Sequence, residues 1–245
     1  MKTATLLEVR GLTKHFGGIT AVDRCSFAVP AGTISALIGP NGSGKTTVFN
    51  LTTGYLRRDA GDVVFDGRTV GRPDPMRLYR RGLTRTFQQA RIFRNLTLVE
   101  NLCLGVPRGW PAFLRRDIGG NERARAMEIL AEFGLAELAG ATAGELSYGQ
   151  QKLLEFASVL ISRPKLVLLD EPTAGVNPVM VERLEGHIRS LHARGITFLV
   201  VEHDMNLVMR LCDPVIVMDH GTKLAEGPPA EVQRDPAVLD AYLGD

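Results

Sequence analysis

A short segment at residues 39–47 constrains the fold of this chain more than any other feature. It reads GPNGSGKTT and matches the pattern GxxxxGK[ST]. The apolar run at 34–38 precedes it and a helical pattern ending near Gly54 follows it, which is the order of a phosphate-binding loop. Glycines let backbone N–H groups converge on phosphate oxygens, and the N-terminus of the next helix adds positive potential. The segment therefore predicts a nucleotide-binding α/β fold.

The residues of this loop have distinct expected roles. Lys45 would bring positive charge to the β and γ phosphates of ATP, and the Thr46 hydroxyl would help to hold a magnesium ion. By itself the loop indicates only nucleotide binding, because kinases, GTPases and motor ATPases share it. A glycine turn with a purely structural role is the alternative. The residues that we expect at the nucleotide are Gly39, Pro40, Asn41, Gly42, Ser43, Gly44, Lys45, Thr46 and Thr47.

Composition narrows the kind of protein. With 245 residues, 44% of them apolar and 23% charged, the chain is an ordinary globular protein that is large enough for one sizeable core. Its formal net charge of +2 gives no electrostatic reason to expect a nucleic-acid partner. Three widely spaced cysteines without a CxxC pair argue against a zinc site and fit a reducing cytosol. We expect no secretory signal and no membrane span, so any membrane role would depend on partner proteins.

Two kinds of strand pattern are present. Unbroken apolar runs indicate strands of a parallel sheet that are buried on both faces, at residues 34–38, 166–169 and 198–201. Alternating segments separated by Gly, Pro and Asp predict an antiparallel patch near the N-terminus, at residues 6–10, 25–29 and 63–66.

The arrangement of these patterns predicts one domain over residues 1–245. Its α/β core would comprise approximately residues 1–87 and 161–245, and a helical subdomain approximately residues 88–160. The segment 105–120 is rich in Gly, Pro and Arg. It is either a loop with an exposed apolar tip or an irregular wall of the helical region.

Two carboxylates follow the apolar run 166–169. Asp170 and Glu171 would lie at the carboxyl end of a buried strand, where open α/β sheets place their ligands. Neighbouring residues of an extended chain point in opposite directions, so we assign them different roles. Asp170 would bind magnesium through water, and Glu171 would polarise the attacking water as general base. His203 follows the run 198–201 and would lie at the same edge, hydrogen-bonded to the γ-phosphate. Solvated acids and a structural histidine are the alternatives.

The segment 146–151, LSYGQQ, resembles the signature of ABC ATPases, which usually reads LSGGQ. Tyr148 stands in place of the first glycine. From the residues alone, Ser147 and Gly149 open a helix near Gln150, which gives the chain a second anion-binding helix end. The resemblance implies that this end serves the ATP of a partner subunit, so that two nucleotides lie between two subunits. The residues implied are Leu146, Ser147, Tyr148, Gly149 and Gln150.

The resemblance covers essentially the whole chain and implies further roles. Phe16 looks like the aromatic residue that stacks on adenine, with a core Phe packed near Val22 as the alternative. Gln88 looks like the glutamine that touches magnesium and senses the transmembrane partner, which would add it to the catalytic set, and Gln89 is a second candidate for that role. The loop that couples the two nucleotide sites would comprise Ala174, Gly175, Val176 and Asn177. The last position of this loop is commonly Asp in the family, whereas here it is the uncharged Asn177. An explanation of the loop's role that relies on charge therefore does not apply to this chain.

Four segments look like the LivG-type subunit of branched-chain amino-acid importers: 151–155, 175–178, 201–205 and 240–244. The resemblance implies a RecA-like P-loop NTPase core with an N-terminal antiparallel β subdomain and an inserted helical subdomain. It implies an ATP hydrolase with ATP and Mg²⁺ as cofactors, peripheral at the cytoplasmic face of the inner membrane.

The implied partners are transmembrane permease subunits, a second ABC ATPase subunit in a heterodimer or homodimer and, indirectly, an extracytoplasmic substrate-binding protein. A urea or aromatic-acid importer is an alternative. A soluble ABC ATPase of DNA repair or of the ribosome is less compatible, because such proteins usually carry two cassettes or a long coiled coil. A small-molecule kinase would leave the 146–151 segment unexplained.

Overall fold

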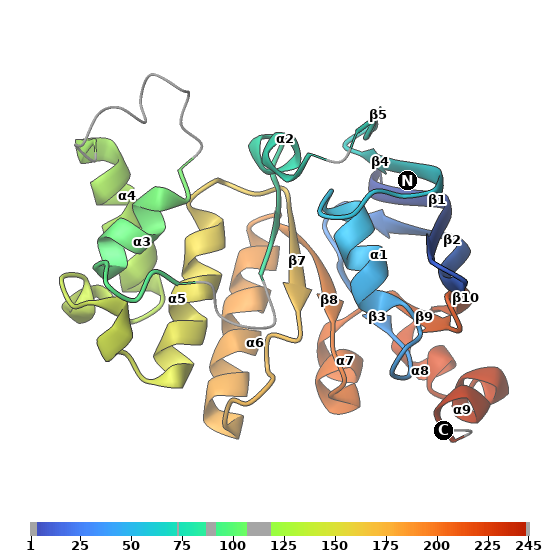
Figure 1. Cartoon of the computed structure of the whole chain (residues 1–245). Helices are drawn as coiled ribbons and strands as arrows, with labels where there is room; N and C mark the ends of the chain where they lie inside the picture. The colour runs from blue at the N-terminus through green and yellow to red at the C-terminus, as the bar shows by residue number, and fades with distance from the viewer. Residues whose placement is uncertain (1–3, 73, 87–91, 107–118, 244–245) are drawn as a thin grey trace.

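The computed structural model describes residues 4–72, 74–86, 92–106 and 119–243 (Figure 1). Two β-sheets organise the chain. The smaller sheet has the strand order β2-β1-β4-β5 and is antiparallel. Its strands are β1 (Thr5–Phe16), β2 (Ile19–Pro30), β4 (Ala60–Phe65) and β5 (Arg68–Thr69). The antiparallel patch predicted near the N-terminus is therefore confirmed.

The larger sheet has the order β10-β9-β3-β8-β7-β6. All neighbouring strands from β9 to β6 pair in parallel, and β10 pairs with β9 antiparallel at one edge. The strands are β3 (Ile34–Ile38), β6 (Leu83–Arg85), β7 (Leu166–Asp170), β8 (Thr197–Val201), β9 (Val215–Asp219) and β10 (Thr222–Gly227). Every residue of β3, β7 and β8 is buried, as their largely apolar sequences predict.

The core explains why these strands are apolar on both sides. Successive residues of β7 enter two separate hydrophobic clusters, with Val167 and Leu169 in one and Leu166 and Leu168 in the other. The second cluster is shared with helix α1 (Lys45–Thr52) and the antiparallel sheet. The first is shared with the helices that cover the opposite face. These are α5 (Tyr148–Leu160), α6 (Pro178–Ala193) and α7 (Met205–Leu211).

A helical region lies beside the sheet, at the left of Figure 1. It contains α3 (Leu98–Leu104), α4 (Gly120–Glu132), α5 and two short 3₁₀ turns (Ala136–Leu138 and Ala143–Glu145). An aromatic series joins it to the sheet: Phe133 meets Phe156 edge-to-face at 5.5 Å, and Phe156 meets Phe198 of β8 at 6.4 Å. The first cluster is thus continuous from the helical region into the sheet.

Short helices complete the chain: α2 (Pro75–Arg80), α8 (Pro229–Val232) and α9 (Pro236–Leu243). Most of the Gly- and Pro-rich segment 105–120 lies outside the described residues, as do Gln88 and Gln89. Among the residues that the structure describes, no helix is both long and apolar enough to cross a membrane.

Candidate active site

The loop between β3 and α1 has a curvature that requires glycine at two positions. Gly39 has φ 148°, and a Cβ built on it would lie 2.1 Å from the carbonyl oxygen of Met218. Gly44 has φ 97°, and its Cβ would lie 2.6 Å from the carbonyl oxygen of Ala21. Both distances are far inside van der Waals contact. The loop predicted from the sequence therefore has the close backbone packing for which its glycines are suited.

Lys45, the first residue of α1, is buried within this loop. Its ammonium donates hydrogen bonds to the carbonyl oxygens of Gly39 (2.8 Å) and Pro40 (2.7 Å). Burial lowers the pKa of Lys45, and the nearby carboxylate of Glu171 opposes that shift. The ammonium is thus held at the loop itself by two of the loop's own carbonyl oxygens.

The oxygen donors at this edge of the sheet suit a magnesium ion. Thr46, the second residue of α1, is exposed, and Asp170 ends β7 with a buried carboxylate. Hydroxyl and carboxylate oxygens are the hard ligands that Mg²⁺ prefers, with water completing its shell. Gln88, the third residue expected near the metal, lies outside the described residues.

The two acids after β7 meet different partners. The Oδ2 atom of Asp170 accepts a hydrogen bond from Arg85 at 2.8 Å, whereas Oε1 of Glu171 lies 3.0 Å from Nε2 of His203. Burial raises the pKa of Asp170, and the charge of Arg85 opposes this shift. We expected the two side chains to point apart because neighbouring residues of an extended chain do so, but the structure shows a different cause. Glu171 does not continue the strand: its φ of 48° is left-handed, and this turn separates the two side chains.

His203 follows β8, the strand that pairs with β7, and its contact with Glu171 places it at the expected edge of the sheet.

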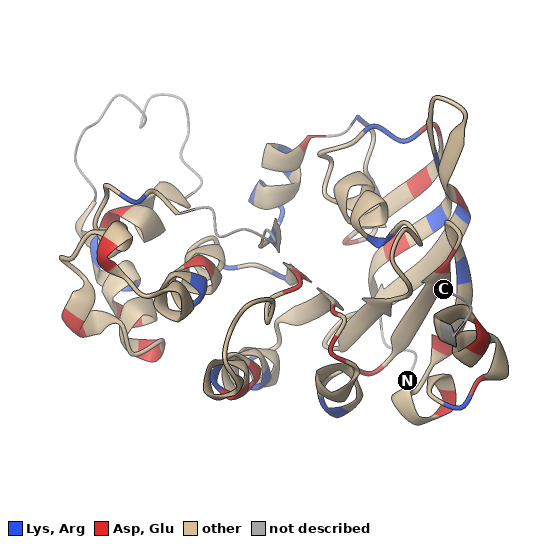
Figure 2. Ribbon diagram, turned by 60° about the horizontal axis from the view of Figure 1, so that its bottom comes forward, with Lys and Arg blue, Asp and Glu red and all other residues tan. Residues whose placement is uncertain are grey.

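Glu202, which the sequence did not lead us to expect in the site, connects two segments at this edge. Glu202 is buried and accepts hydrogen bonds from the backbone N–H (3.0 Å) and hydroxyl (2.6 Å) of Thr173. It thereby ties the segment after Glu171 to the end of β8. Figure 2 shows acidic residues at the ends of adjacent central strands.

The 146–150 segment begins α5, but two residues earlier than expected. The helix starts at Tyr148 rather than near Gln150, because Ser147 is its N-cap. The Ser147 hydroxyl accepts from the Gln150 N–H (3.4 Å), and the Gln150 side chain accepts from the Ser147 N–H (3.0 Å). This reciprocal capping box was readable in the sequence as a Ser followed by Gln three residues later.

The 174–177 loop contacts the start of α5 within the same chain. The Tyr148 hydroxyl donates to the carbonyl oxygen of Ala174 (3.2 Å), and a Cβ built on Gly175 would lie 3.5 Å from the Tyr148 ring. Asn177 is the N-cap of α6 and accepts from the Met180 N–H (2.9 Å). Asn and Asp are equally good N-caps, so the missing charge leaves this local role intact.

Phe16 lies at the end of β1 and is 48% exposed, so the alternative of a core Phe is wrong. Its neighbour across the hairpin is Ile19, and the ammonium of Lys14 lies 5.4 Å from the ring centroid. The side chain is thus partly open to solvent, and its contact with adenine stays a prediction.

The strand ends and helix ends that carry most of the predicted residues lie on one side of the molecule. In Figure 1, the carboxyl ends of β3, β7 and β8 and the N-terminal ends of α1 and α5 all face the lower side of the view. The two helix ends are distinct, with β7, β8 and α6 between them. A cavity of about 570 Å³ adjoins the phosphate loop on the side of α9, and Asp219 and His220 also line it.

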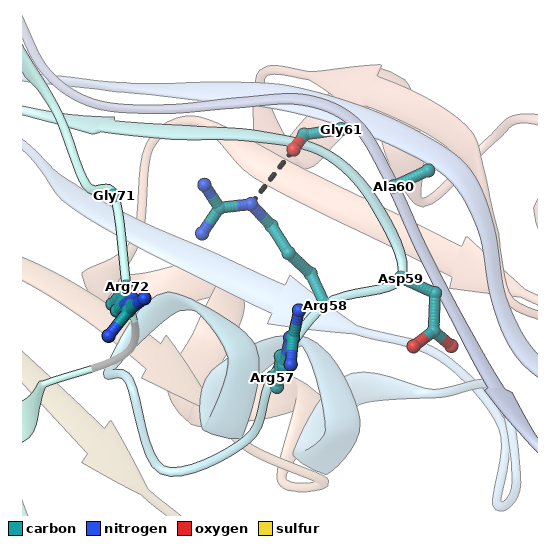
Figure 3. Close-up of a pocket in the computed structure, with 7 residues that line it drawn as sticks. All are labelled: Arg57, Arg58, Asp59, Ala60, Gly61, Gly71 and Arg72. Carbon is teal, nitrogen blue, oxygen red and sulfur yellow. Dashed lines mark hydrogen bonds between the residues drawn. The ribbon is translucent and has the colours of Figure 1, made fainter.

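A second cavity, of about 650 Å³, belongs to the antiparallel sheet (Figure 3). Its lining includes Arg57, Arg58, Asp59 and Arg72. Arg58 donates to the carbonyl oxygen of Gly61 (2.8 Å), and Asp59 accepts from Lys14 (2.9 Å) and the His15 N–H (2.7 Å). These two charged groups therefore hold strands and loops together, and we assign the cavity no catalytic role.

The sequence model of a family described as "ABC transporter" matches residues 22–174. The chain belongs to the ABC transporter family. A second model, described as "Branched-chain amino acid ATP-binding cassette transporter", matches residues 222–245 of the cassette.

Individual proteins resemble the cassette over its full length. The high-affinity branched-chain amino acid transport ATP-binding protein BraF of Pseudomonas aeruginosa is 39% identical, over 98% of both chains. The corresponding protein LivG of Escherichia coli is also 39% identical over 98% of both chains. A solved structure of an ATP-binding cassette from an ABC transporter in its ADP conformation has a TM-score of 0.89 and 36% identity, covering 99% of this chain and 100% of that one. The expected fold class and the assignment as an ABC-type ATPase are therefore confirmed.

Proposed function

We propose that this ABC ATPase powers an importer for branched-chain or related amino acids. The observation that carries the substrate class is the match of residues 222–245 to the model described for branched-chain amino acid cassettes. The names of the full-length relatives from Pseudomonas aeruginosa and Escherichia coli support it. The cassette would lie at the cytoplasmic face of the inner membrane as a peripheral subunit.

The proposed hydrolytic step uses the contact between Glu171 and His203. Glu171 would accept the proton of the attacking water, and His203, 3.0 Å from it, would orient that water and hydrogen-bond the γ-phosphate. Lys45 would hold the β and γ phosphates from within the loop. Magnesium bound by Thr46, Gln88 and, through water, Asp170 would screen the phosphate charge.

The second anion-binding helix end is proposed to act on a partner's nucleotide. Its residues begin α5, apart from the phosphate loop of the same chain (Figure 1). Closure of two cassettes would bring residues 146–150 of each to the ATP of the other, with residues 174–177 coupling the two sites. Phe16 would stack on adenine. Loss of the γ-phosphate would remove the contacts that favour the closed state.

The proposed assembly contains two transmembrane permease subunits, and Gln88 would sense their position. The second cassette would be a related ATPase or another copy of this chain. A substrate-binding protein outside the membrane would deliver the solute to the permease. Affinity capture of the tagged chain from detergent-solubilised native membranes, followed by mass spectrometry, would identify these proteins. Recovery of soluble factors without permeases would contradict the assembly.

Uptake measurements test the substrate class. Cells that lack this chain should lose high-affinity uptake of labelled leucine, isoleucine or valine, and the wild-type gene should restore it. A Glu171→Gln chain produced at the same level should not restore uptake. Normal branched-chain amino-acid uptake together with lost urea or aromatic-acid uptake would assign the cassette to a different importer.

A further inference from the structure

Arg85 is a buried cation beside the proposed metal site that the roles above do not use. It ends β6, and its side chain is only 6% exposed. Its guanidinium donates to Oδ2 of Asp170 (2.8 Å) and to Oδ1 of Asn50 (2.7 Å). Longer bonds reach the hydroxyl of Thr53 and the carbonyl oxygen of Thr86, both at 3.3 Å. The side chain thus joins β6, β7 and α1.

Aromatic rings add to this enclosure. The guanidinium carbon of Arg85 lies 5.9 Å from the ring centroid of Phe49 and 5.5 Å from that of Tyr55. Burying a charge is costly unless it is paired and hydrogen-bonded. The planar fork of an arginine meets this requirement, because it can bind several acceptors at fixed angles, which a lysine ammonium does not reproduce.

Asp170 is held at both its side chain and its backbone. Its carboxylate is bound by Arg85, and its backbone N–H donates to the hydroxyl of Thr86 (3.2 Å). One carboxylate oxygen is therefore committed to Arg85, which orients the other. Through Asn50, the same guanidinium is anchored to α1, the helix whose first turn carries Lys45 and Thr46.

We propose that Arg85 is a positioning residue for the magnesium site, which holds the Asp170 carboxylate in the orientation that binds the metal's water. The proposal rests on the role of Asp170 in the proposed function. Because Arg85 also binds α1, it would keep Asp170 and Thr46 at a constant separation. Residues that orient a metal ligand from outside the coordination shell typically contribute tenfold to a hundredfold to metal affinity.

The test compares nucleotide binding with and without metal in the purified full chain. The dissociation constant of a fluorescent ADP would be measured in Mg²⁺ and in EDTA, and Mn²⁺ binding in the presence of ADP would be followed by electron paramagnetic resonance. For Arg85→Lys, we expect Mn²⁺ affinity to fall about tenfold or more. Nucleotide affinity in EDTA should change little. Asn50→Ala, which removes only the bond to α1, should give a smaller loss in the same direction.

Arg81 provides a matched control. It also lies over an aromatic ring, that of Phe65 at 5.3 Å, and hydrogen-bonds the Phe65 carbonyl oxygen. Arg81 has no part in the proposed metal site, so Arg81→Lys should leave metal binding unchanged. Thermal unfolding of both variants separates lost folding from lost metal affinity. If Arg85→Lys does not fold, Asn50→Ala carries the test.

Asp170→Asn separates failure of this inference from failure of the proposed function. Loss of metal dependence in Asp170→Asn together with wild-type Mn²⁺ affinity in Arg85→Lys and Asn50→Ala would overturn the role of Arg85 alone. Unchanged metal dependence in Asp170→Asn would overturn the metal role of Asp170, and the inference with it.

Discussion

The hydroxyl of Tyr148 donates a hydrogen bond to the carbonyl oxygen of Ala174, 3.2 Å away, and so joins two segments that are proposed to act across a subunit interface. The aromatic ring also lies against Gly175. The tyrosine that replaces the usual glycine of the signature therefore makes an internal contact between the start of α5 and the loop before α6.

Replacing Tyr148 with Phe removes this hydrogen bond and keeps the ring. We expect the ATPase rate at saturating ATP to fall about two- to tenfold, since a single hydrogen bond contributes roughly 0.5–1.5 kcal/mol. The dependence of rate on ATP concentration should become less cooperative, because the two segments would no longer move together. Tyr79→Phe, which removes a hydroxyl on α2 that donates to the Gly105 carbonyl oxygen, is the control. Equal cooperativity in wild type and Tyr148→Phe would argue against coupling through this contact.

Replacing Glu171 with Gln removes the proposed general base while keeping its size. Loss of such a group typically costs at least about a hundredfold in rate. ATP binding should persist, so the variant should accumulate as a dimer with ATP and Mg²⁺ in size-exclusion chromatography. Glu182→Gln, an exposed change on α6, should behave as wild type. Turnover at the wild-type rate in Glu171→Gln would refute the role of Glu171.

Replacing Gly39 with Ala tests the close packing of the phosphate loop. The added Cβ would lie 2.1 Å from the Met218 carbonyl oxygen, so the loop must shift. We expect lower stability to urea and loss of nucleotide affinity. Gly186 lies within α6 with no atom near its Cβ position. The control Gly186→Ala should therefore stabilise the chain by roughly 0.5–1 kcal/mol through helix propensity. Wild-type nucleotide affinity in Gly39→Ala would contradict the observed packing.

The ring of His187 on α6 stacks on Phe133 at 4.2 Å between centroids. Burial lowers the pKa of His187, with Glu132 opposing the shift. A histidine that resists protonation in the folded state stabilises the fold above its ordinary pKa of about 6.5 and loses this contribution as pH falls below that value. The urea midpoint should thus decrease from pH 7.5 to pH 5.5, and less so in His187→Phe, which keeps an aromatic ring. Equal decreases in the two proteins would show that His187 does not contribute.

The central strands β3, β7 and β8 were predictable because they are buried on both faces, which leaves a largely apolar run in each. The phosphate loop, Asp170, Glu171 and His203 follow directly from the ends of these runs. The orientation of Glu171 was not predictable, because its left-handed turn depends on how the chain leaves the strand.

Arg85 and Glu202 show why other site residues escaped prediction. Their partners are distant in sequence: Asp170 lies 85 positions from Arg85, and Thr173 lies 29 positions from Glu202. Arginines and glutamates are usually exposed, and only the sheet order brings these pairs together. Phe16 was ambiguous for a related reason, since an aromatic residue at a strand end fits either face of a sheet.

The rings of Phe133, Phe156 and Phe198 form a continuous contact between the helical region and β8, the strand that leads into Glu202 and His203. A rotation of α5 relative to the sheet would therefore either carry β8 with it or slide Phe156 over Phe198. A shift of β8 would in turn reach the helical region through the same packed rings.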